Sequence, residues 1–579
     1  MTDVELSCAA LVAAVLALLA PAVPGWLILV LVPVAVALRH PWTLALLLVV
    51  VVGWRSHADL AGLVAPRPEP VTTEVTVVTD AVESFGRWNV DVIDGERHES
   101  ATISRSESEP EVGEHLTVAG RRTPATASVS NRARHISARL TVDQVRSRSG
   151  PNMLFTGVNG LRNLLVDGAE CLGADRPLFA GLVLGDDSQQ TDRLRHDFRA
   201  SGLAHLLAVS GQNVAFVLVA TSPLLGRLQL RSRWVVTVGV LALFTLVTRW
   251  EPSVLRAVVM ALVAAGASLT GRYASGTRLL SAAVLILLVA DPLLVWSTGF
   301  RLSVAASAAL VALQRPIERR LPFPGWLAAP LATVLAAQIG TAPLLAAMGA
   351  RLSVASIPAN LLAVPVAGWV MVWGLVGGLV AGVAGGPVAT LIHGPTGWML
   401  AWIDRVATTA ASPRWPSLGS GELLVVAGLV VSMWLTRSTR LRRVVAVTAT
   451  VILLLVLLRS PPAGRFAPTT GLAIARSPGG STVVVAGGQV RAGRLLDELT
   501  RQQVDHVDLL VLTSSGRSTT ATAATVREVT EVGRVLADPA LVRGAIALVP
   551  GPVRVGDLSL AVRRRGTRWE VDVAPMQGR

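Results

Sequence analysis

The chain has 579 residues, of which 52% are hydrophobic and 16% charged, and its formal net charge is +14 at pH 7. This composition is too apolar for one soluble domain of this length, so much of the chain is expected to lie in lipid. Its 52 basic residues are all arginine. Because membrane proteins concentrate arginine in their cytoplasmic loops, the positive charge alone does not indicate a nucleic-acid-binding protein.

Three apolar runs, separated by prolines, open the chain at residues 6–20, 23–38 and 42–54. Each is short beside the ~20 residues that a membrane-spanning helix needs. The runs predict about three N-terminal transmembrane helices in residues 1–54.

Charged residues return in residues 55–149, where hydrophobic and polar residues alternate, as in the stretches 71–78 and 138–144. Alternation with a period of two, rich in β-branched residues, predicts strands. We therefore expect a small, mostly antiparallel β domain, with a barrel as one possible form.

Residues 150–200 are predicted to form amphipathic helices. Leu154, Val158, Leu161 and Leu165 fall on one helical face. Such a helix either lies on the membrane surface or packs against the β domain, and both alternatives stay open.

Apolar runs return in residues 201–460 and predict a membrane domain of about ten segments. The runs are 203–222, 233–249, 253–270, 278–296, 298–313, 326–349, 354–375, 376–392, 421–436 and 442–458. The stretch 394–420 is more broken and is predicted to be peripheral.

Residues 465–579 have the composition of a soluble domain. Apolar strands are predicted at 481–487 and 507–513, and a helical stretch at 492–504 lies between them. This alternation is typical of an α/β domain.

Arginine-rich short loops predict the orientation in the membrane. With ten segments, four such loops fall on one side: 226–233, 271–278, 315–320 and 437–443. The positive-inside rule makes that side cytoplasmic. The chain is therefore predicted to be a multi-pass protein of the cytoplasmic membrane with both soluble domains extracytoplasmic.

A polar cluster, Ser210, Gly211, Gln212 and Asn213, interrupts the apolar run at 203–222. His205, Gln212 and Asn213 share one face if the helix is continuous, whereas Ser210-Gly211 permit a close backbone approach or a break. Unpaired polar groups are costly in lipid, so this face is expected to look toward protein or water. The cluster either lines a translocation path or joins helices by hydrogen bonds.

Two further polar residues in apolar runs, Gln338 and Asn360, add to the hypothesis of a path. Four arginines are predicted toward the outer face: Arg249, Arg256, Arg301 and Arg351. Converging cations in a region of low dielectric would concentrate a polyanion. The alternative is that they pair with Glu251 and Asp291 or extend to the membrane interface.

Two stretches carry a family resemblance: "FRASGLAHLLAVSGQNVAF" at 198–216 and "SIPANLLAVPVAG" at 356–368. With supporting stretches at 179–188, 251–260 and 291–306, they resemble the ComEC competence proteins, which are inner-membrane channels for DNA uptake in natural transformation. The resemblance implies a polytopic α-helical membrane protein. It also implies an extracytoplasmic OB-like β domain and a C-terminal α/β metallo-β-lactamase-like domain.

The resemblance further implies import of single-stranded DNA, with residues 210–213 in the channel core. In the β domain, Phe85 and Trp88 provide few aromatic surfaces on which bases could stack. DNA contact there would depend on four arginines: Arg121, Arg122, Arg132 and Arg134. The alternative is a solvated basic face.

The C-terminal domain is expected to lack the family's metal ligands. Residues 514–526, where active relatives carry a His-x-His-x-Asp-His cluster, contain no His, Asp or Glu, and Ala486 stands where an Asp is expected. His506 is the only histidine after residue 393, and one imidazole cannot hold two metal ions. We expect no metal, no cofactor and no catalytic residue. The alternative metal ligands are Asp505, Asp508 and Asp538.

Two other functions stay open, a small-solute permease and a membrane-anchored hydrolase. The chain has no lysine and therefore no G-x-x-x-x-G-K-[ST] nucleotide-binding loop. An ATP-driven motor must then be a separate cytoplasmic protein. A separate DNA receptor and membrane lipid are the other expected partners.

The orientation gives a first testable prediction. Reporter fusions at positions 100 and 520 should both report an extracytoplasmic location, because an even number of segments separates the two soluble domains. Opposite locations for the two fusions would overturn this topology.

Overall fold

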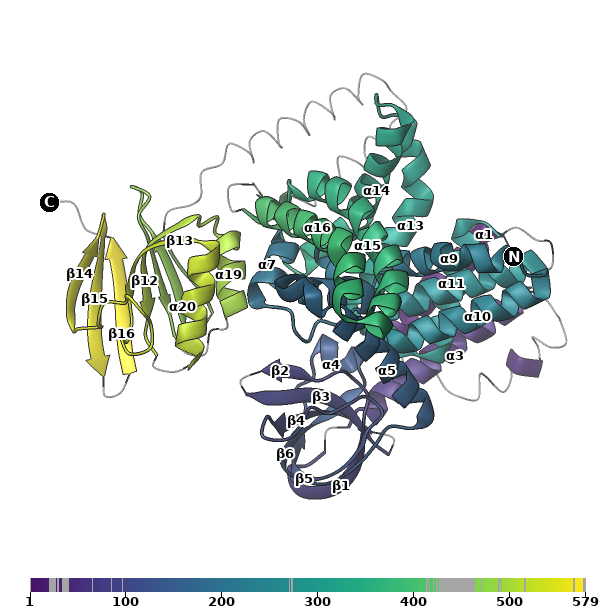
Figure 1. Cartoon of the computed structure of the whole chain (residues 1–579), viewed down its shortest axis with the longest axis horizontal. Helices are drawn as coiled ribbons and strands as arrows, with labels where there is room; N and C mark the ends of the chain where they lie inside the picture. Colours follow the sequence, from purple (N-terminus) through teal and green to yellow (C-terminus); the bar gives the residue numbers. More distant parts are fainter. Residues whose placement is uncertain are drawn as a thin grey trace. The chain divides into compact units, whose positions relative to one another are not determined.

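A computed structural model describes most of the chain, which is drawn as a ribbon in Figure 1. The described residues are 2–19, 28, 31–33, 41–64, 66–84, 86–95, 97–269, 271, 274–412, 415, 417–419, 421–422, 425, 464–469, 471–487, 490, 492–514, 517–565 and 568–575. The predicted segments at 23–38, 421–436 and 442–458 lie almost entirely outside these residues.

The chain divides into two compact units. The first unit comprises Met1–Gln189, His205–Leu344 and Val364–Ile403, and the second comprises Gln190–Ala204, Leu345–Ala363 and Asp404–Arg579. Each unit is described by itself below.

Two N-terminal helices belong to the first unit, α1 (Asp3–Leu19) and α3 (Pro41–Gly62). Alanines on one side of α1, among them Ala9, Ala13 and Ala17, are buried in a cluster that includes Leu288 of α12 (Gly276–Ala290). Small side chains let helix backbones approach closely, which is how helices associate in lipid without a hydrophobic driving force.

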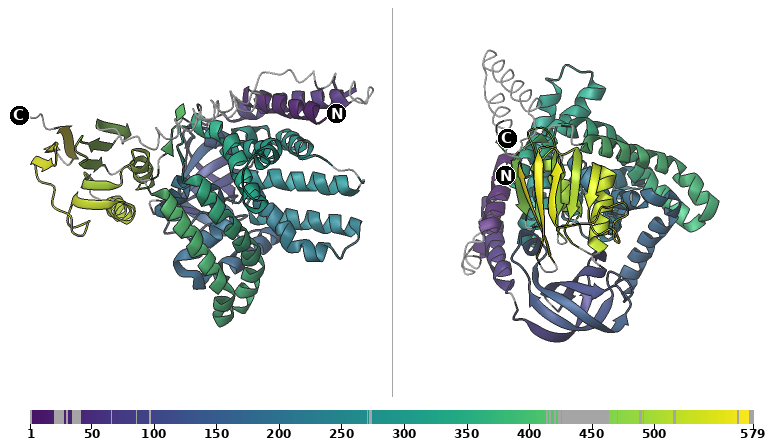
Figure 2. Two further views of the ribbon diagram at one scale, coloured as in Figure 1. Left: turned by 90° about the horizontal axis from the view of Figure 1, so that it is seen from above. Right: turned by 90° about the vertical axis from the view of Figure 1, so that its left-hand side faces the viewer.

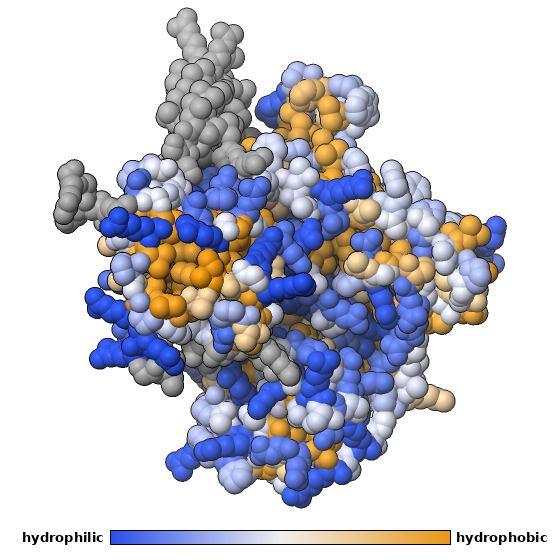
Figure 3. Space-filling view, turned by 60° about the vertical axis from the view of Figure 1, so that its left-hand side comes forward, coloured by the Kyte–Doolittle hydropathy of each residue, from blue (hydrophilic) through white to orange (hydrophobic). Residues whose placement is uncertain are grey.

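The remaining long helices follow in chain order: α9 (Gly211–Leu225), α10 (Leu230–Val247), α11 (Pro252–Leu269), α13 (Thr298–Glu318), α14 (Gly325–Ala347), α15 (Ser356–Ala384) and α16 (Gly386–Ala411). Five described helices are long and apolar enough to cross a membrane, namely α3, α10, α11, α14 and α15. α9 and α12 are apolar but shorter. In Figure 3, apolar and hydrophilic side chains both reach the surface, and the lower part of the view is largely hydrophilic. The chain thus fits a multi-pass membrane protein with β domains, as predicted.

The predicted division of residues 354–420 is wrong. The runs at 354–375 and 376–392 were expected as separate segments with a peripheral stretch after them, whereas the structure has α15 and then α16, with the break at Gly385-Gly386. Both glycines have positive φ, 62° and 49°. This left-handed conformation ends α15 and is available to glycine without strain, and hydropathy alone does not reveal it.

The alternation in residues 69–149 forms a β domain, as predicted. Its six strands are β1 (Glu69–Val77), β2 (Val82–Ser84), β3 (Arg87–Asp94), β4 (Arg97–Ser104), β5 (His115–Pro124) and β6 (Ile136–Ser149). Their order is β1-β5-β6-β4-β3-β2, and β1 also pairs with β3, which closes a ring of five strands. Every pairing is antiparallel except β4 with β6. Alternate residues such as Val75, Val92, Leu116 and Leu140 fill the interior. The curled sheet lies at the bottom of the right-hand view in Figure 2.

One charged side chain lies buried in this domain. The Arg122 guanidinium forms ion pairs with Asp94, with Glu99 at 2.7 Å and with Glu69 at 3.4 Å. The side chain of Arg122 is 6% exposed and that of Glu99 is fully buried. Three carboxylates thus compensate one buried cation, and together they join β1, β3, β4 and β5.

Helix α5 (Met153–Gly168) follows the β domain and packs on the helical part of the first unit. A Cβ on Gly168 would lie 2.6 Å from the Gly382 nitrogen, and a Cβ on Gly382 would lie 2.2 Å from the Leu164 oxygen. Only glycine at both positions permits this approach of α5 to α15. On the predicted apolar face, Val158 and Leu165 are buried, whereas Leu154 is exposed.

The C-terminal domain, in the second unit, has three layers, visible at the left of Figure 1. The central sheet has the order β13-β12-β11-β10-β9. Its strands are β9 (Gly464–Thr469), β10 (Leu472–Arg476), β11 (Thr482–Ala486), β12 (His506–Leu512) and β13 (Glu531–Leu536). Apolar side chains of α19 (Ala492–Arg501) and α20 (Arg517–Val529) join one core with this sheet. A second core joins it to a sheet of β14 (Gly551–Val555), β15 (Leu558–Arg565) and β16 (Arg568–Pro575).

Arg122 and its neighbour Arg121 provide a matched test of the β domain. Arg122→Ala should destabilise the domain by about 3–5 kcal/mol, because it leaves buried carboxylates without their cation. Arg121 is exposed, so Arg121→Ala should change stability by less than ~0.5 kcal/mol. Urea-dependent proteolysis of the β domain in the full chain measures both. If both variants resist proteolysis up to the same urea concentration, the burial of Arg122 is contradicted.

Candidate functional site

The polar cluster at 210–213 lies where a helix is broken. A short helix, α8 (Ala204–Leu207), ends before the cluster, and α9 begins at Gly211. Ser210 caps α9 with φ −101° and ψ 164°, and its side chain accepts a hydrogen bond from the Gln212 N–H. This extended conformation at the cap interrupts the helix. The break permitted by Ser210-Gly211 is therefore present, and His205 does not share a continuous helical face with Gln212 and Asn213.

Neighbouring helices hold the break in place. Asn213 Nδ2 donates to the Leu182 carbonyl of α6 (Arg176–Leu184) at 3.2 Å. Ser253 Oγ, in the first turn of α11, donates to the Val209 carbonyl at 2.6 Å. Asn213 thus joins helices, which is one of the two roles predicted for the cluster. The Gln212 side chain is exposed.

Arg256 of α11 lies against the start of α9. It is 7% exposed, donates from Nε to Ser303 Oγ of α13 at 2.8 Å, and its Nη1 lies 3.1 Å from Met260 Sδ. Its Nη2 would lie 2.4 Å from a Cβ on Gly211. Within the described residues no carboxylate forms an ion pair with Arg256. A buried cation without a counterion is costly in lipid and marks a functional site by default.

The other predicted path residues lie on α13, α14 and α15. Arg301 lies on α13, and its Nε is buried without a hydrogen-bond partner among the described residues. Gln338 lies on α14, partly buried. Asn360 belongs to the second unit, where its Nδ2 donates to the carbonyls of Ser356 at 2.7 Å and Gly202 at 3.4 Å. The structure therefore brings together Ser210, Gly211, Gln212, Asn213 and Arg256.

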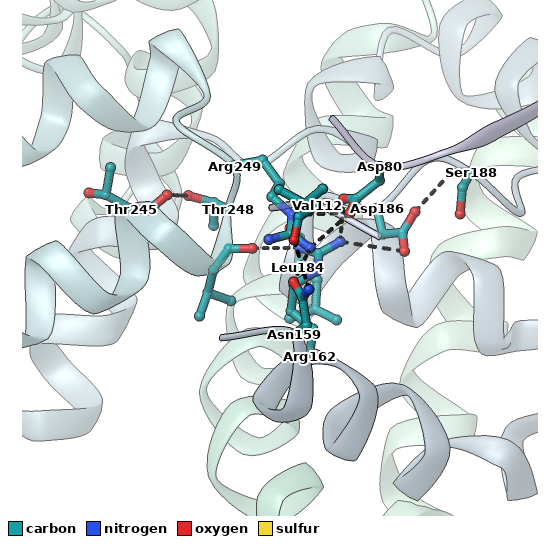
Figure 4. Close-up of polar contacts among 11 residues, drawn as sticks. Asp80, Val112, Asn159, Arg162, Leu184, Asp186, Ser188, Thr245, Thr248 and Arg249 are labelled. Atoms are coloured by element: carbon teal, nitrogen blue, oxygen red, sulfur yellow. Dashed lines mark hydrogen bonds and ion pairs between the residues drawn. The ribbon is translucent and has the colours of Figure 1, made fainter. Parts of the chain in front are cut away.

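A buried ion network lies at the end of the helical part that carries the β domain (Figure 4). Arg162 of α5 is 5% exposed. Its Nη2 donates to Asp80, in the β1–β2 loop, at 2.7 Å and lies 3.5 Å from Asp186. Its Nη1 donates to the carbonyls of Leu184 and Val247, at the ends of α6 and α10. One guanidinium thus joins the β domain to three helices.

Arg249 completes this network. Its Nε donates to Asp80 at 3.0 Å and its Nη2 to Asn159 at 2.8 Å, while Asn159 Nδ2 donates to the Val112 carbonyl in the β4–β5 loop. Burial lowers the pKa of Arg249, and the Asp80 charge opposes that shift. Arg249 therefore pairs with Asp80 instead of the predicted Glu251.

Sequence reasoning missed Arg162 and Asp80. A signal for Arg162 was available, because it lies four residues after Val158 and three before Leu165, within the apolar face of the helix. A charge on such a face indicates a buried partner. Asp80 carries no comparable signal.

The four arginines predicted to contact DNA lie in different environments. Arg121 is exposed and Arg122 is buried among carboxylates. Arg132 lies over the Trp296 ring at 4.8 Å from its centroid, and Arg134 pairs with Asp91 at 2.7 Å. Three of the four are thus engaged within the protein. The structure describes no surface that gathers all of them.

A second tie between the β domain and the helical part lies near Arg132. His135 Nε2 lies 3.2 Å from both carboxylate oxygens of Asp291, which precedes η2 (Pro292–Trp296). The hydrogen bond to Asp291 raises the pKa of His135, with burial opposing it. Asp291 therefore accepts from His135 and is not the predicted partner of an outer-face arginine.

The C-terminal domain carries a hollow beside the ends of β11 and β12 and the start of β10. A cavity of about 490 Å³ is lined by Leu472, Val485, Thr513, Trp569 and neighbouring apolar residues. In the part of the chain that the structure describes, no three His, Cys, Asp or Glu side chains are grouped to hold a metal ion. His506 is half-exposed at the start of β12, beside Asp508 at 3.4 Å.

Comparison with known proteins finds a family match for part of the chain. Residues 182–444 match the model of the competence protein family. The chain is 25% identical over 281 residues to ComE operon protein 3 of Bacillus subtilis (strain 168), which covers 48% of this chain and 36% of that protein. It is 27% identical over 212 residues to the uncharacterized protein YcaI of Escherichia coli (strain K12), which covers 34% of this chain and 28% of that protein.

The predicted resemblance is therefore confirmed: residues 182–444 are a competence-family segment related to ComEC proteins. The matches span only about a third of the length of these relatives. No solved structure matches the chain.

The ion network gives a testable prediction. Arg162→Met should remove the buried cation that bridges Asp80, Asp186 and the ends of α6 and α10, at a cost of about 3–5 kcal/mol. Hydrogen exchange should then become faster in the loops around Asp80 and Val112, which this network holds. Arg176→Met, which removes a pair with the exposed Asp167, is the control and should leave exchange in these loops unchanged. Unchanged exchange in Arg162→Met would show that other contacts hold the β domain.

Proposed function

We propose that the chain is a channel of the cytoplasmic membrane that imports single-stranded DNA during natural transformation. The competence family of residues 182–444 supports a role in DNA uptake. That segment contains α9 to α16, and a channel role goes one step beyond the family match.

The observation that carries the proposal is the broken helix inside the family segment. Irregular backbone is tolerated at membrane depth where it is buried in protein or lines an aqueous cavity. Val209 is held by α11 and Asn213 by α6, and Ser210 Oγ donates to Asn213 Oδ1, so the break is a fixed feature. Gln212 is the polar side chain of this turn that stays exposed, and it therefore has the chemistry of a path-lining group.

The β domain supports the predicted OB-like module outside the membrane. Its five-stranded ring is the kind of small closed barrel to which OB folds belong. Trp88 packs partly against the barrel core, and its indole donates to the Glu107 carbonyl. Phe85 lies outside the described residues. The stacking surface on this domain is therefore thin, and we assign DNA contact chiefly to the helical part.

The C-terminal domain is proposed to be an extracytoplasmic, metallo-β-lactamase-like domain without hydrolase activity. Strand β12 runs from an exposed His506 to Leu512, and Thr513 donates its N–H to the Ala486 carbonyl at 3.0 Å. This strand end therefore carries a hydroxyl and an alanine where a metal site would need imidazole and carboxylate. Degradation of the other DNA strand is then the work of a separate protein, as are DNA capture and the ATP-driven motor.

Uptake of labelled DNA tests the proposed function. Gln212→Leu should reduce import to about a tenth or less while the protein stays in the membrane, because an apolar side chain closes a polar path without hindering insertion. Gln212→Asn keeps the amide and should retain most of the import. The measurement is transformation frequency in cells that lack the native gene and carry each variant.

Three results would contradict the proposal. Import by Gln212→Leu at the level of the parent would make Gln212 irrelevant to the path. If cells without the gene take up DNA normally but no longer transport a small solute, the protein is a permease. Metal-dependent DNA cleavage by the full chain, abolished by a chelator, would indicate a hydrolase.

A further inference from the structure

We propose that Arg256, Gly211 and the N-terminus of α9 form an anion site that holds one backbone phosphate at a time. The inference rests on the proposed import of DNA and names the group of the strand that is recognised. It assigns a binding role to a buried cation that has no ion-pair partner among the described residues.

Arg256 is the first element of the site. Its Nε and Nη1 are directed to Ser303 and to the Met260 sulfur, which are both uncharged. The Nη2 donates no hydrogen bond among the described residues. The cation is therefore held in place on one side and has donor capacity left on the other. Guanidinium is the side chain whose geometry suits phosphate oxygens best.

Gly211 is the second element. A Cβ at this position would lie 2.4 Å from Nη2 and 3.1 Å from the Ala257 Cβ. Any other residue would thus push the guanidinium away from the start of α9. Glycine keeps the charge and the helix end within reach of the same ligand atom.

The helix end is the third element. α9 has 15 residues, and the first N–H groups of such a helix carry a partial positive charge. Ser210 satisfies the Gln212 N–H by its side chain and the Asn213 N–H by its carbonyl. The Gly211 N–H donates no hydrogen bond within the described residues. It and Nη2 are the two free donors, and a phosphodiester oxygen can accept from both.

The depth of the site fits a strand that enters from the end with the β domain. Arg256 lies four residues after Pro252, so it is roughly 6 Å along α11 from the helix start. The ion network of Arg162 and Arg249 lies just before that start. A phosphate at Arg256 would thus lie about one helical turn beyond this network, where a buried cation offsets the cost of leaving water.

Phosphate-dependent stability of the purified full chain in detergent tests the site. Inorganic phosphate and a short single-stranded oligonucleotide should each raise the unfolding temperature of the parent protein, because a ligand stabilises the state that binds it. Arg256→Met should abolish this increase and reduce DNA import by about tenfold or more. It should also raise the unfolding temperature without phosphate, since it removes a buried charge that has no counterion. A purely structural arginine would instead lose stability.

Two glycine variants provide the matched comparison. Gly211→Ala displaces the Arg256 guanidinium and tightens the contact with Ala257 by a few tenths of an ångström, so it should fold, yet weaken the effect of phosphate. Gly266→Ala, on α11 with open space around it, should behave as the parent protein. An oligonucleotide with an uncharged methylphosphonate backbone should not raise the unfolding temperature. Added phosphatidylglycerol should raise it less than the charged oligonucleotide does.

The outcomes separate this inference from the proposed function. A phosphate effect that persists in Arg256→Met, or a larger effect of the lipid than of the oligonucleotide, would overturn the phosphate site while leaving the channel proposal intact. In another outcome, phosphate raises the unfolding temperature only when Arg256 is present, but cells that lack the protein still take up DNA normally. That result would support the anion site and reject the import of DNA.

Discussion

The buried guanidinium of Arg162 is the interaction on which the arrangement of the first unit depends. It joins Asp80 of the β domain to the ends of α6 and α10. Arg249 and Trp250, which both have positive φ, form the tight turn that follows α10. That turn sets where α11 begins, and α11 then places Ser253 against Val209 and Arg256 against Gly211. The geometry of the helix break thus depends on an ion network outside the break.

The buried arginines differ in how their charges are compensated, and this difference separates structure from function. Arg122 has three carboxylates and Arg162 has two, so removal of either cation is expected to cost stability. Arg256 is as buried, but its described neighbours are a hydroxyl and a thioether. Folding gains little from such a charge, whereas an anionic ligand would supply the missing counterion. Functional sites commonly retain charges that are costly to stability.

The sequence predicted the strands of the β domain, the α/β pattern of the C-terminal domain and most helices, because these follow from hydrophobic periodicity. Local residue types at Ser210-Gly211 allowed either a close backbone approach or a break, and the structure has the break. The closure of β1 on β3 and the meeting of Arg162 with Asp80 depend on residues far apart in the chain, which no local pattern encodes. The end of α15 was misplaced because Gly385-Gly386 stop the helix by backbone conformation, within a run that hydropathy treats as continuous.

A crosslinking measurement in living cells tests most directly whether DNA passes the helix break. A photoreactive amino acid would be placed at Ala215, an exposed position on α9 three residues after Gln212, and in a second strain at Leu243, an exposed apolar position on α10. Cells taking up labelled DNA would be illuminated, and the protein analysed for bound nucleotides. A DNA adduct is expected at position 215 and none at position 243. Adducts at neither position, or equally at both, during active uptake would contradict a path along the start of α9.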